Sequence, residues 1–88
     1  NRLMNQSVIF TDQVYPETNQ VKFIAQQQGV NINCYASFSV ISELCDKQVV
    51  SGSNVVCLFE QCRFDLEDQA EALIEQEAFN DSGDIILA

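Results

Sequence analysis

Alternating polar and apolar residues predict three strands in the first part of the chain. Residues 7–10 are mostly β-branched or aromatic, which is typical of a short strand. Residues 20–26 and 30–36 alternate with a period of two, as a half-buried strand requires. Gly29 lies between them and can adopt the positive φ that a tight hairpin needs. The pattern therefore predicts an antiparallel hairpin preceded by a strand, with Pro16 in the loop 11–19 between them.

The hydrophobic spacing becomes helical from residue 37. Ser37 or Ser39 is positioned to cap the first turn of a helix that extends to about residue 46. Gly52 interrupts the pattern, and Ser53 or Asn54 is positioned to cap a second helical segment. The apolar stripe of the first helix consists of Val40, Ile41, Leu44 and Cys45.

Helical spacing then continues through residues 53–78. One unbroken helix of that length would measure about 39 Å. A folded domain of 88 residues has a radius of gyration of only about 12 Å. We therefore expect a break near residues 63–65, with Asp65 capping the helix that follows. Residues 80–83 then form a turn, and residues 84–88 form a last strand.

These elements predict the fold class. Their order along the chain is β-β-β-α-α-α-β, which favours an α+β two-layer sandwich. We expect a four-stranded, mostly antiparallel sheet with the helices on one face. Residues 1–88 form a single domain in this interpretation, with Met4 as a start residue and residues 1–3 as an extension.

The acidic residues are concentrated in the second half of the chain. The net charge is −9. From residue 51 onward nine acidic residues face a single arginine, a balance of −8, whereas residues 1–50 have four acidic and three basic residues, a balance of −1. Phosphate backbones and anionic membranes both require cations, so neither is an expected direct ligand. The longest apolar run is residues 55–59, far below the ~20 residues of a membrane span. The opening residues do not show the pattern of a secretion signal, so we expect a cytoplasmic protein.

Histidine is absent from the sequence, and this excludes active sites that depend on histidine. Without histidine the Ser-His and Cys-His nucleophile pairs cannot form. None of the four cysteines belongs to a C-x-x-C pair, so we interpret them as small buried apolar residues in a reducing compartment. A structural zinc site built from four scattered thiolates is the alternative. No cofactor or metal is predicted. The cysteines are Cys34, Cys45, Cys57 and Cys62.

The segment "RFDLEDQAEALIEQE", residues 63–77, combines six carboxylates with one arginine. On a helix its apolar residues face the core, and Glu67, Glu71 and Glu75 align on one ridge. Three interpretations remain open: a solvated face, an anionic surface that docks a basic protein, and a metal or catalytic carboxylate site. The docking hypothesis uses Glu60, Glu67, Asp68, Glu71 and Glu75; the buried stripe is Leu66, Ala70, Leu73 and Ile74.

The opposite face of the sheet carries a second set of apolar side chains. If one face of the sheet packs on the helices, the other exposes Ile9, Ile24, Tyr35 and Ile86. Scattered apolar residues on a surface are one interpretation. A contact between two copies of the chain, or with a partner, is the other.

The residues Arg63, Phe64 and Asp65 suggest a structural corner. We expect Arg63 to pair with a carboxylate, Phe64 to fill the core and Asp65 to cap the next helix. A ligand-binding role for Arg63 is the alternative.

Several stretches together resemble a known family. These are "MNQSVIF" from Met4, then Phe23, Gly29 and Cys34, and above all "RFDLEDQAEALIEQE" followed by Gly83. They resemble the YrdB-like domain of unknown function, a family of small proteobacterial proteins. The resemblance implies a cytosolic, single-domain bacterial protein with an α+β fold. It implies no activity, ligand or catalytic residue.

The sequence is therefore interpreted as a non-catalytic, acidic interaction module that docks a basic protein partner. The alternative is a small carboxylate-dependent enzyme or a cation-binding protein. A homodimer through the sheet face is compatible with either function.

Overall fold

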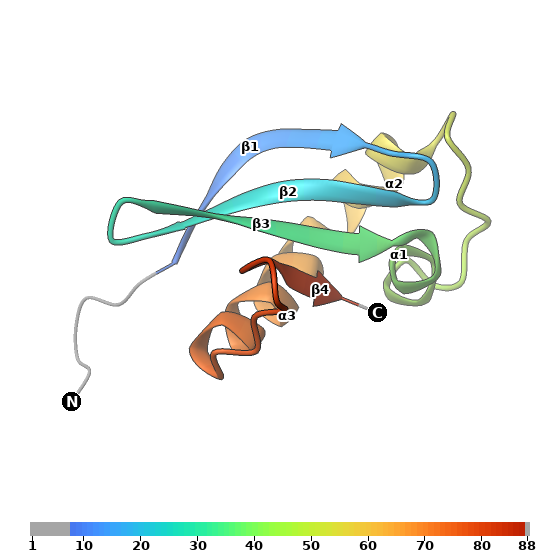
Figure 1. The fold of residues 1–88 in the computed structure, drawn as a ribbon. Helices are drawn as coiled ribbons and strands as arrows, with labels where there is room; N and C mark the ends of the chain where they lie inside the picture. Colours follow the sequence, from blue (N-terminus) through green and yellow to red (C-terminus); the bar gives the residue numbers. More distant parts are fainter. Residues whose placement is uncertain (1–7, 88) are drawn as a thin grey trace.

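The computed structural model describes residues 8–87 as a four-stranded sheet with helices on one face (Figure 1). The first three strands pair antiparallel, and the last pairs parallel to the third. The predicted α+β class with a mostly antiparallel sheet is confirmed. The expected start at Met4, the extension 1–3 and the first strand residue, Ser7, lie outside the described residues. The strands, in their order across the sheet, are β1 (Ile9–Pro16), β2 (Gln20–Gln27), β3 (Val30–Ser37) and β4 (Ile85–Leu87).

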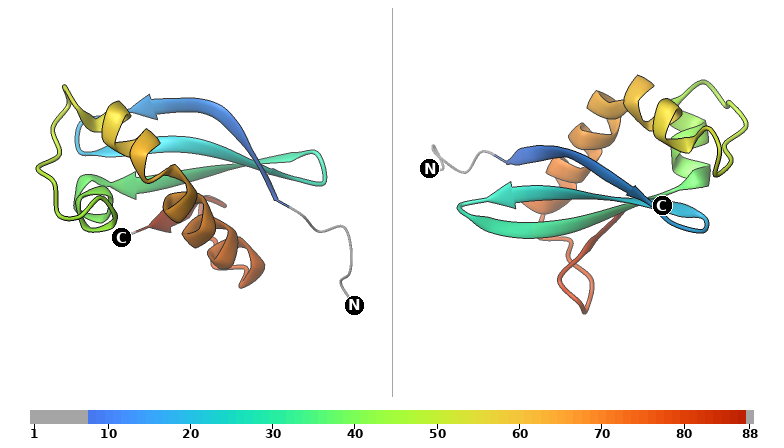
Figure 2. Two further views of the ribbon diagram at one scale, coloured as in Figure 1. Left: turned by 180° about the vertical axis from the view of Figure 1, so that it is seen from behind. Right: turned by 90° about the horizontal axis from the view of Figure 1, so that it is seen from above.

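Three helices connect β3 to β4, and the edge-on view shows the second and third of them on the same side of the sheet (Figure 2). They are α1 (Phe38–Leu44), α2 (Val55–Gln61) and α3 (Arg63–Glu75). This chain order explains the parallel pairing, because a strand that returns after a long crossover can run alongside β3 in the same direction. None of the described helices is long and apolar enough to cross a membrane.

β1 is longer than predicted, because residues 11–16 continue the strand instead of forming a loop. β1 lies at the edge of the sheet, where Pro16 can end a strand without removing an interior hydrogen bond. The strand is also bulged. Phe10 pairs with Ala25 and Val14 with Phe23, so three residues of β1 face a single residue of β2.

Of the caps expected for α1 and α2, one is observed and the other makes no capping bond. Ser37 does cap α1, since its hydroxyl accepts the Val40 N–H at 3.1 Å. Asn54 precedes α2 but makes no capping bond to it. Its amide oxygen accepts the Ser51 N–H at 2.8 Å, so this side chain organises the preceding loop.

The predicted break in the long helical segment occurs at Cys62, one residue before the expected range. The Cys62 N–H is shared between the carbonyl oxygens of Leu58 and Phe59, both at 3.2 Å. α3 then ends earlier than predicted, at Glu75 instead of residue 78. Glu77 adopts a left-handed φ of 57°, and the Ala78 N–H donates back to Leu73, which closes the last turn.

One hydrophobic core lies between the sheet and the helices. Phe23 of β2 and Phe59 of α2 meet edge to face with ring centroids 5.1 Å apart, and both are fully buried. α3 contributes the predicted stripe, of which Leu66, Ala70 and Ile74 are buried. The other buried side chains of the strands are Val21, Ala25, Ile32, Cys34, Ala36, Ile85 and Leu87.

Candidate functional site

Arg63 lies at the junction of α2 and α3 and binds four different residues. Its Nε and Nη2 donate to the two carboxylate oxygens of Glu60 at 2.8 and 2.5 Å. Nη1 donates to Glu67 at 3.2 Å and to the main-chain oxygen of Thr11 at 3.4 Å. Nη2 also donates to the main-chain oxygen of Asp12 at 3.1 Å. These five bonds match the five N–H donors of a guanidinium, so no donor is left for a ligand.

The surroundings of Arg63 favour its charged form. The hydrogen bond to Glu60 is the main cause that raises the pKa of Arg63, and the bond to Glu67 adds to it. The same contact with Arg63 lowers the pKa of the Glu60 carboxyl. The guanidinium also lies over the Phe59 ring, with its central carbon 5.2 Å from the ring centroid. Arg63 therefore joins the helices to the bulge of β1.

The expected roles of Phe64 and Asp65 are wrong. Phe64 is 79% exposed and does not enter the core. On a helix with about 100° per residue it lies about 160° from Leu66, which is fully buried. Asp65 does not cap α3, because Cys62 occupies the N-cap position and makes no side-chain capping bond. Asp65 lies in the first helical turn, where its charge still interacts favourably with the helix dipole.

Phe64 shares the outer side of α3 with three carboxylates. Asp68, Glu71 and Glu75 follow it at spacings of four, three and four residues, which keep all four side chains on one side of a helix. Asp68 and Glu75 are exposed, and Glu71 is half-buried. We name this set the outer stripe; it consists of Phe64, Asp68, Glu71 and Glu75.

Two members of the expected docking surface lie elsewhere. Glu60 and Glu67 both form ion pairs with Arg63. Only 17% of the Glu67 side chain is exposed, so it is not part of a freely solvated ridge with Glu71 and Glu75. Residues four positions apart on a helix are rotated by about 40° relative to each other, so Glu67, Glu71 and Glu75 do not lie on one straight line. Glu67 is the one that points toward Arg63.

The outer stripe has no cationic partner within the described residues. Residues 8–87 contain three cationic side chains. Lys22 lies over the Tyr15 ring, Lys47 is 4.0 Å from Glu43, and Arg63 is occupied as described. None of these three cations therefore forms an ion pair with a carboxylate of the outer stripe.

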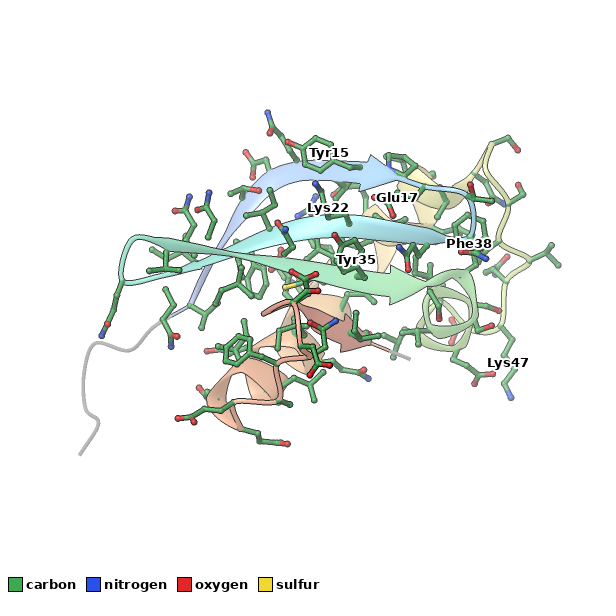
Figure 3. The ribbon with its side chains drawn as sticks, in the orientation of Figure 1. Tyr15, Glu17, Lys22, Tyr35, Phe38 and Lys47 are labelled. Carbon is green, nitrogen blue, oxygen red and sulfur yellow. The ribbon has the colours of Figure 1, made fainter. Side chains whose placement is uncertain are left out.

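The open face of the sheet carries a row of side chains that crosses all four strands. Tyr15 pairs with Lys22, Lys22 with Tyr35, and Tyr35 with Ile86. Residues that face each other across neighbouring strands point to the same side of a sheet, so these four form one line. Figure 3 shows Tyr15, Lys22 and Tyr35 projecting from successive strands. We name Tyr15, Lys22, Tyr35 and Ile86 the sheet row.

The hypothesised sheet-face residues all lie on this open face. Ile9 pairs with Gln26 beyond the bulge and is 63% exposed, and Ile24 is half-buried beside the row. Ile86 is 46% exposed. Sequence reasoning missed Tyr15, because residues 11–19 were interpreted as a loop. The apolar or aromatic residues Val14 and Tyr15 before Pro16 are the feature that could have extended the strand prediction.

Two carboxylates lie near the sheet row. Burial raises the pKa of Tyr35 most, and the nearby charges of Asp84 and Glu17 raise it further. Glu17 follows β1 and accepts a bond from the Gln20 side-chain amide at 2.7 Å. Asp84 immediately precedes β4.

The cysteines are free thiols, and three of them are buried as predicted. Cys57 is the exception and is exposed. Burial raises the pKa of Cys34 to about 12, and burial together with the neighbouring Cys45 raises that of Cys62 to about 12. Within residues 8–87, no three cysteine or carboxylate side chains gather closely enough to hold a metal ion.

Comparisons with known proteins give a family but no activity. The profile of a family described as "Protein of unknown function (DUF1488)" matches residues 8–87. A crystal structure of a protein of unknown function from the DUF1488 family of Shewanella loihica PV-4 is similar, with a TM-score of 0.85 and 45% sequence identity. The match covers 96% of this chain and 94% of that one. No curated protein matches. The YrdB-like name expected from the sequence does not occur in these matches.

Proposed function

We propose that this chain, which belongs to the DUF1488 family of proteins of unknown function, is an interaction module that docks a basic protein partner on the outer stripe. One observation carries the proposal: Phe64 is 79% exposed on a helix and is aligned with three carboxylates that have no cationic partner among residues 8–87. The binding element in this proposal is α3, and the sheet supports it.

Phe64 supplies the apolar anchor of the proposed site. A phenylalanine that is transferred from water into a contact contributes about 2 kcal/mol or more. Aromatic side chains at the centre of an interface commonly dominate its binding energy. Phe64 contributes almost nothing to the stability of the isolated domain, because it stays in water while Phe59 and Leu66 are buried in the core.

The three carboxylates define the chemistry of the partner. The stripe from Phe64 to Glu75 is about 16 Å long at 1.5 Å per residue, which matches about three turns of a partner helix. A segment with lysine or arginine side chains around one apolar residue fits this surface. Each cation would meet a carboxylate, and one could also lie over the Phe64 ring.

Affinity capture with matched variants tests the proposal. The immobilised protein is exposed to a native bacterial extract at low and at high salt, and the retained proteins are identified. We expect retention of a basic protein that high salt releases, because charge pairs at a surface are screened by ions. Phe64→Ala and the double variant Asp68→Asn/Glu75→Gln should each lower retention tenfold or more.

Control variants distinguish a specific effect of the outer stripe from a general effect of exposed phenylalanines or of net charge. Phe79→Ala removes another exposed phenylalanine, and Asp46→Asn/Asp81→Asn makes the same change in net charge away from α3. Both controls should retain the partner like the wild type. Equal losses in the stripe variants and the controls would show that net acidity alone attracts basic proteins, and the proposal would be wrong.

A further inference from the structure

We propose that a second copy of this chain docks on the open face of the sheet, with the sheet row at the centre of a two-fold contact. This contact is separate from the outer stripe, because the stripe faces away from the sheet on the helical side. The two surfaces are therefore testable independently.

The open face combines rigid aromatic and aliphatic side chains. Tyr15 is 38% exposed and Ile86 46% exposed, at the two ends of the sheet row. Lys22 stands between the two tyrosines, with its ammonium 5.1 Å from the Tyr15 ring centroid. Ile24 and Ile9 extend the apolar area along the strands. Tyrosines on a rigid sheet lose little conformational freedom on binding, which suits them to an interface.

The charges on this face are self-complementary. Lys22 lies within the sheet row and is paired with Tyr35 on the next strand. Glu17 and Asp84 lie close to this Tyr35. In a two-fold contact each copy's Lys22 can meet a carboxylate of the other copy, and this happens twice by symmetry. The sum of these three charges is −1, while the chain carries −9. The three carboxylates of the outer stripe sum to −3, so two copies repel each other less through their sheet faces than through their outer stripes.

The size of the face sets the expected strength of the contact. The three longer strands have eight residues each, and β4 has three. At the usual strand spacing and rise the face covers about 450 Å² on each copy. A total of about 900 Å² is below the usual size of stable interfaces. We therefore expect a weak dimer that forms at high micromolar concentration and presents the two outer stripes on opposite sides.

Sedimentation velocity over a concentration range up to about 1 mM tests this inference. The wild type should shift toward twice the chain mass of 9.9 kDa as concentration rises. Ile24→Lys should stay at the chain mass throughout. Val49→Lys is the matched control, since Val49 is an apolar residue that is 83% exposed in the loop before α2, away from the sheet. A wild type that remains at the chain mass at all concentrations would overturn the inference.

A charge-swap experiment identifies the contact itself. Lys22→Glu alone should be monomeric, because acidic side chains of the two copies then face each other. Glu17→Lys/Asp84→Lys alone should also be monomeric, because cationic side chains of the two copies then face each other. An equimolar mixture of the two variants should recover the dimer, since both contacts are again between opposite charges. A mixture that stays monomeric while the wild type dimerises would show that another surface is used. Circular dichroism of each variant confirms that the fold is retained.

Discussion

The guanidinium of Arg63 donates to the main-chain oxygen of Asp12 at 3.1 Å, across 51 positions of sequence. Asp12 lies in the bulge of β1, where three residues oppose one on β2. A bulge removes some main-chain groups from the strand ladder. Arg63 supplies donors to two of these carbonyl oxygens, so the start of α3 holds the irregular edge of the sheet in place.

Replacing Arg63 should therefore lower stability more than a typical surface substitution. We expect Arg63→Ala to reduce the free energy of unfolding by about 2 kcal/mol, because it breaks charged hydrogen bonds at a position that is only 17% exposed. Arg63→Lys should lose most of that amount, since an ammonium cannot reproduce the planar fork. Urea unfolding followed by circular dichroism measures both values.

Lys47→Ala is the control for Arg63. The Lys47 side chain is 78% exposed and its pair with Glu43 is 4.0 Å long, so its loss should change stability by less than about 0.5 kcal/mol. If Arg63→Ala is as stable as the wild type, the contacts of Arg63 with β1 do not stabilise the fold and the structural role assigned to Arg63 is wrong.

The pair of Arg63 and Glu60 should also make stability depend on pH. The hydrogen bond lowers the pKa of Glu60 in the folded protein below the ordinary value of 4.5 that applies to the unfolded chain. The unfolded chain therefore binds more protons in this window, and the contribution of Glu60 is present above pH 4.5 and is lost as the pH falls through the folded-state value. The difference in unfolding free energy between the wild type and Glu60→Gln should shrink from pH 7 to pH 3. A difference that is independent of pH would refute this assignment.

The two serines near the start of α1 offer a test of the observed cap. Ser37 accepts the Val40 N–H, whereas Ser39 is exposed within the first turn. Ser37→Ala should cost about 1 kcal/mol of unfolding free energy. Ser39→Ala should change it by less than about 0.5 kcal/mol. Thermal unfolding of both variants measures the contrast, and a reversed order would place the cap at Ser39.

The thiols should differ sharply in reactivity. Cys57 is exposed, whereas Cys34 and Cys62 are buried and have raised pKa values of about 12. Thiolates are the reactive species, so a thiol reagent at pH 8 should modify one cysteine per folded chain rapidly. Cys57→Ser should abolish this rapid phase, and unfolding should expose all of the remaining thiols. Two or more rapid thiols in the folded wild type would contradict the burial of the others.

Much of the fold could be predicted from the sequence because local patterns determine it. The hairpin of β2 and β3 follows from strict alternation around Gly29, and the register keeps Phe23 and Cys34 paired on the buried face. The helical stripe of Leu66, Ala70 and Ile74 follows from its spacing. The length argument also predicted the break before α3 to within one residue.

The features that could not be predicted depend on contacts between distant segments. β1 extends to Pro16 because β2 pairs with it, and its bulge is held by Arg63 from the other end of the chain. Phe64 was expected in the core because an aromatic side chain favours burial on its own. The phase of α3 relative to the sheet instead gives that place to Leu66.

The most direct test of the proposed docking surface is a titration of the ¹⁵N-labelled protein with an amphipathic peptide of lysine and leucine, observed by two-dimensional NMR. We predict that the amide shifts concentrate on Phe64, Asp68 and Glu71, and that Phe64→Ala weakens binding tenfold or more while Phe79→Ala does not. Shifts concentrated on the strands, or equal affinities of the two variants, would contradict the assignment of the outer stripe as the binding surface.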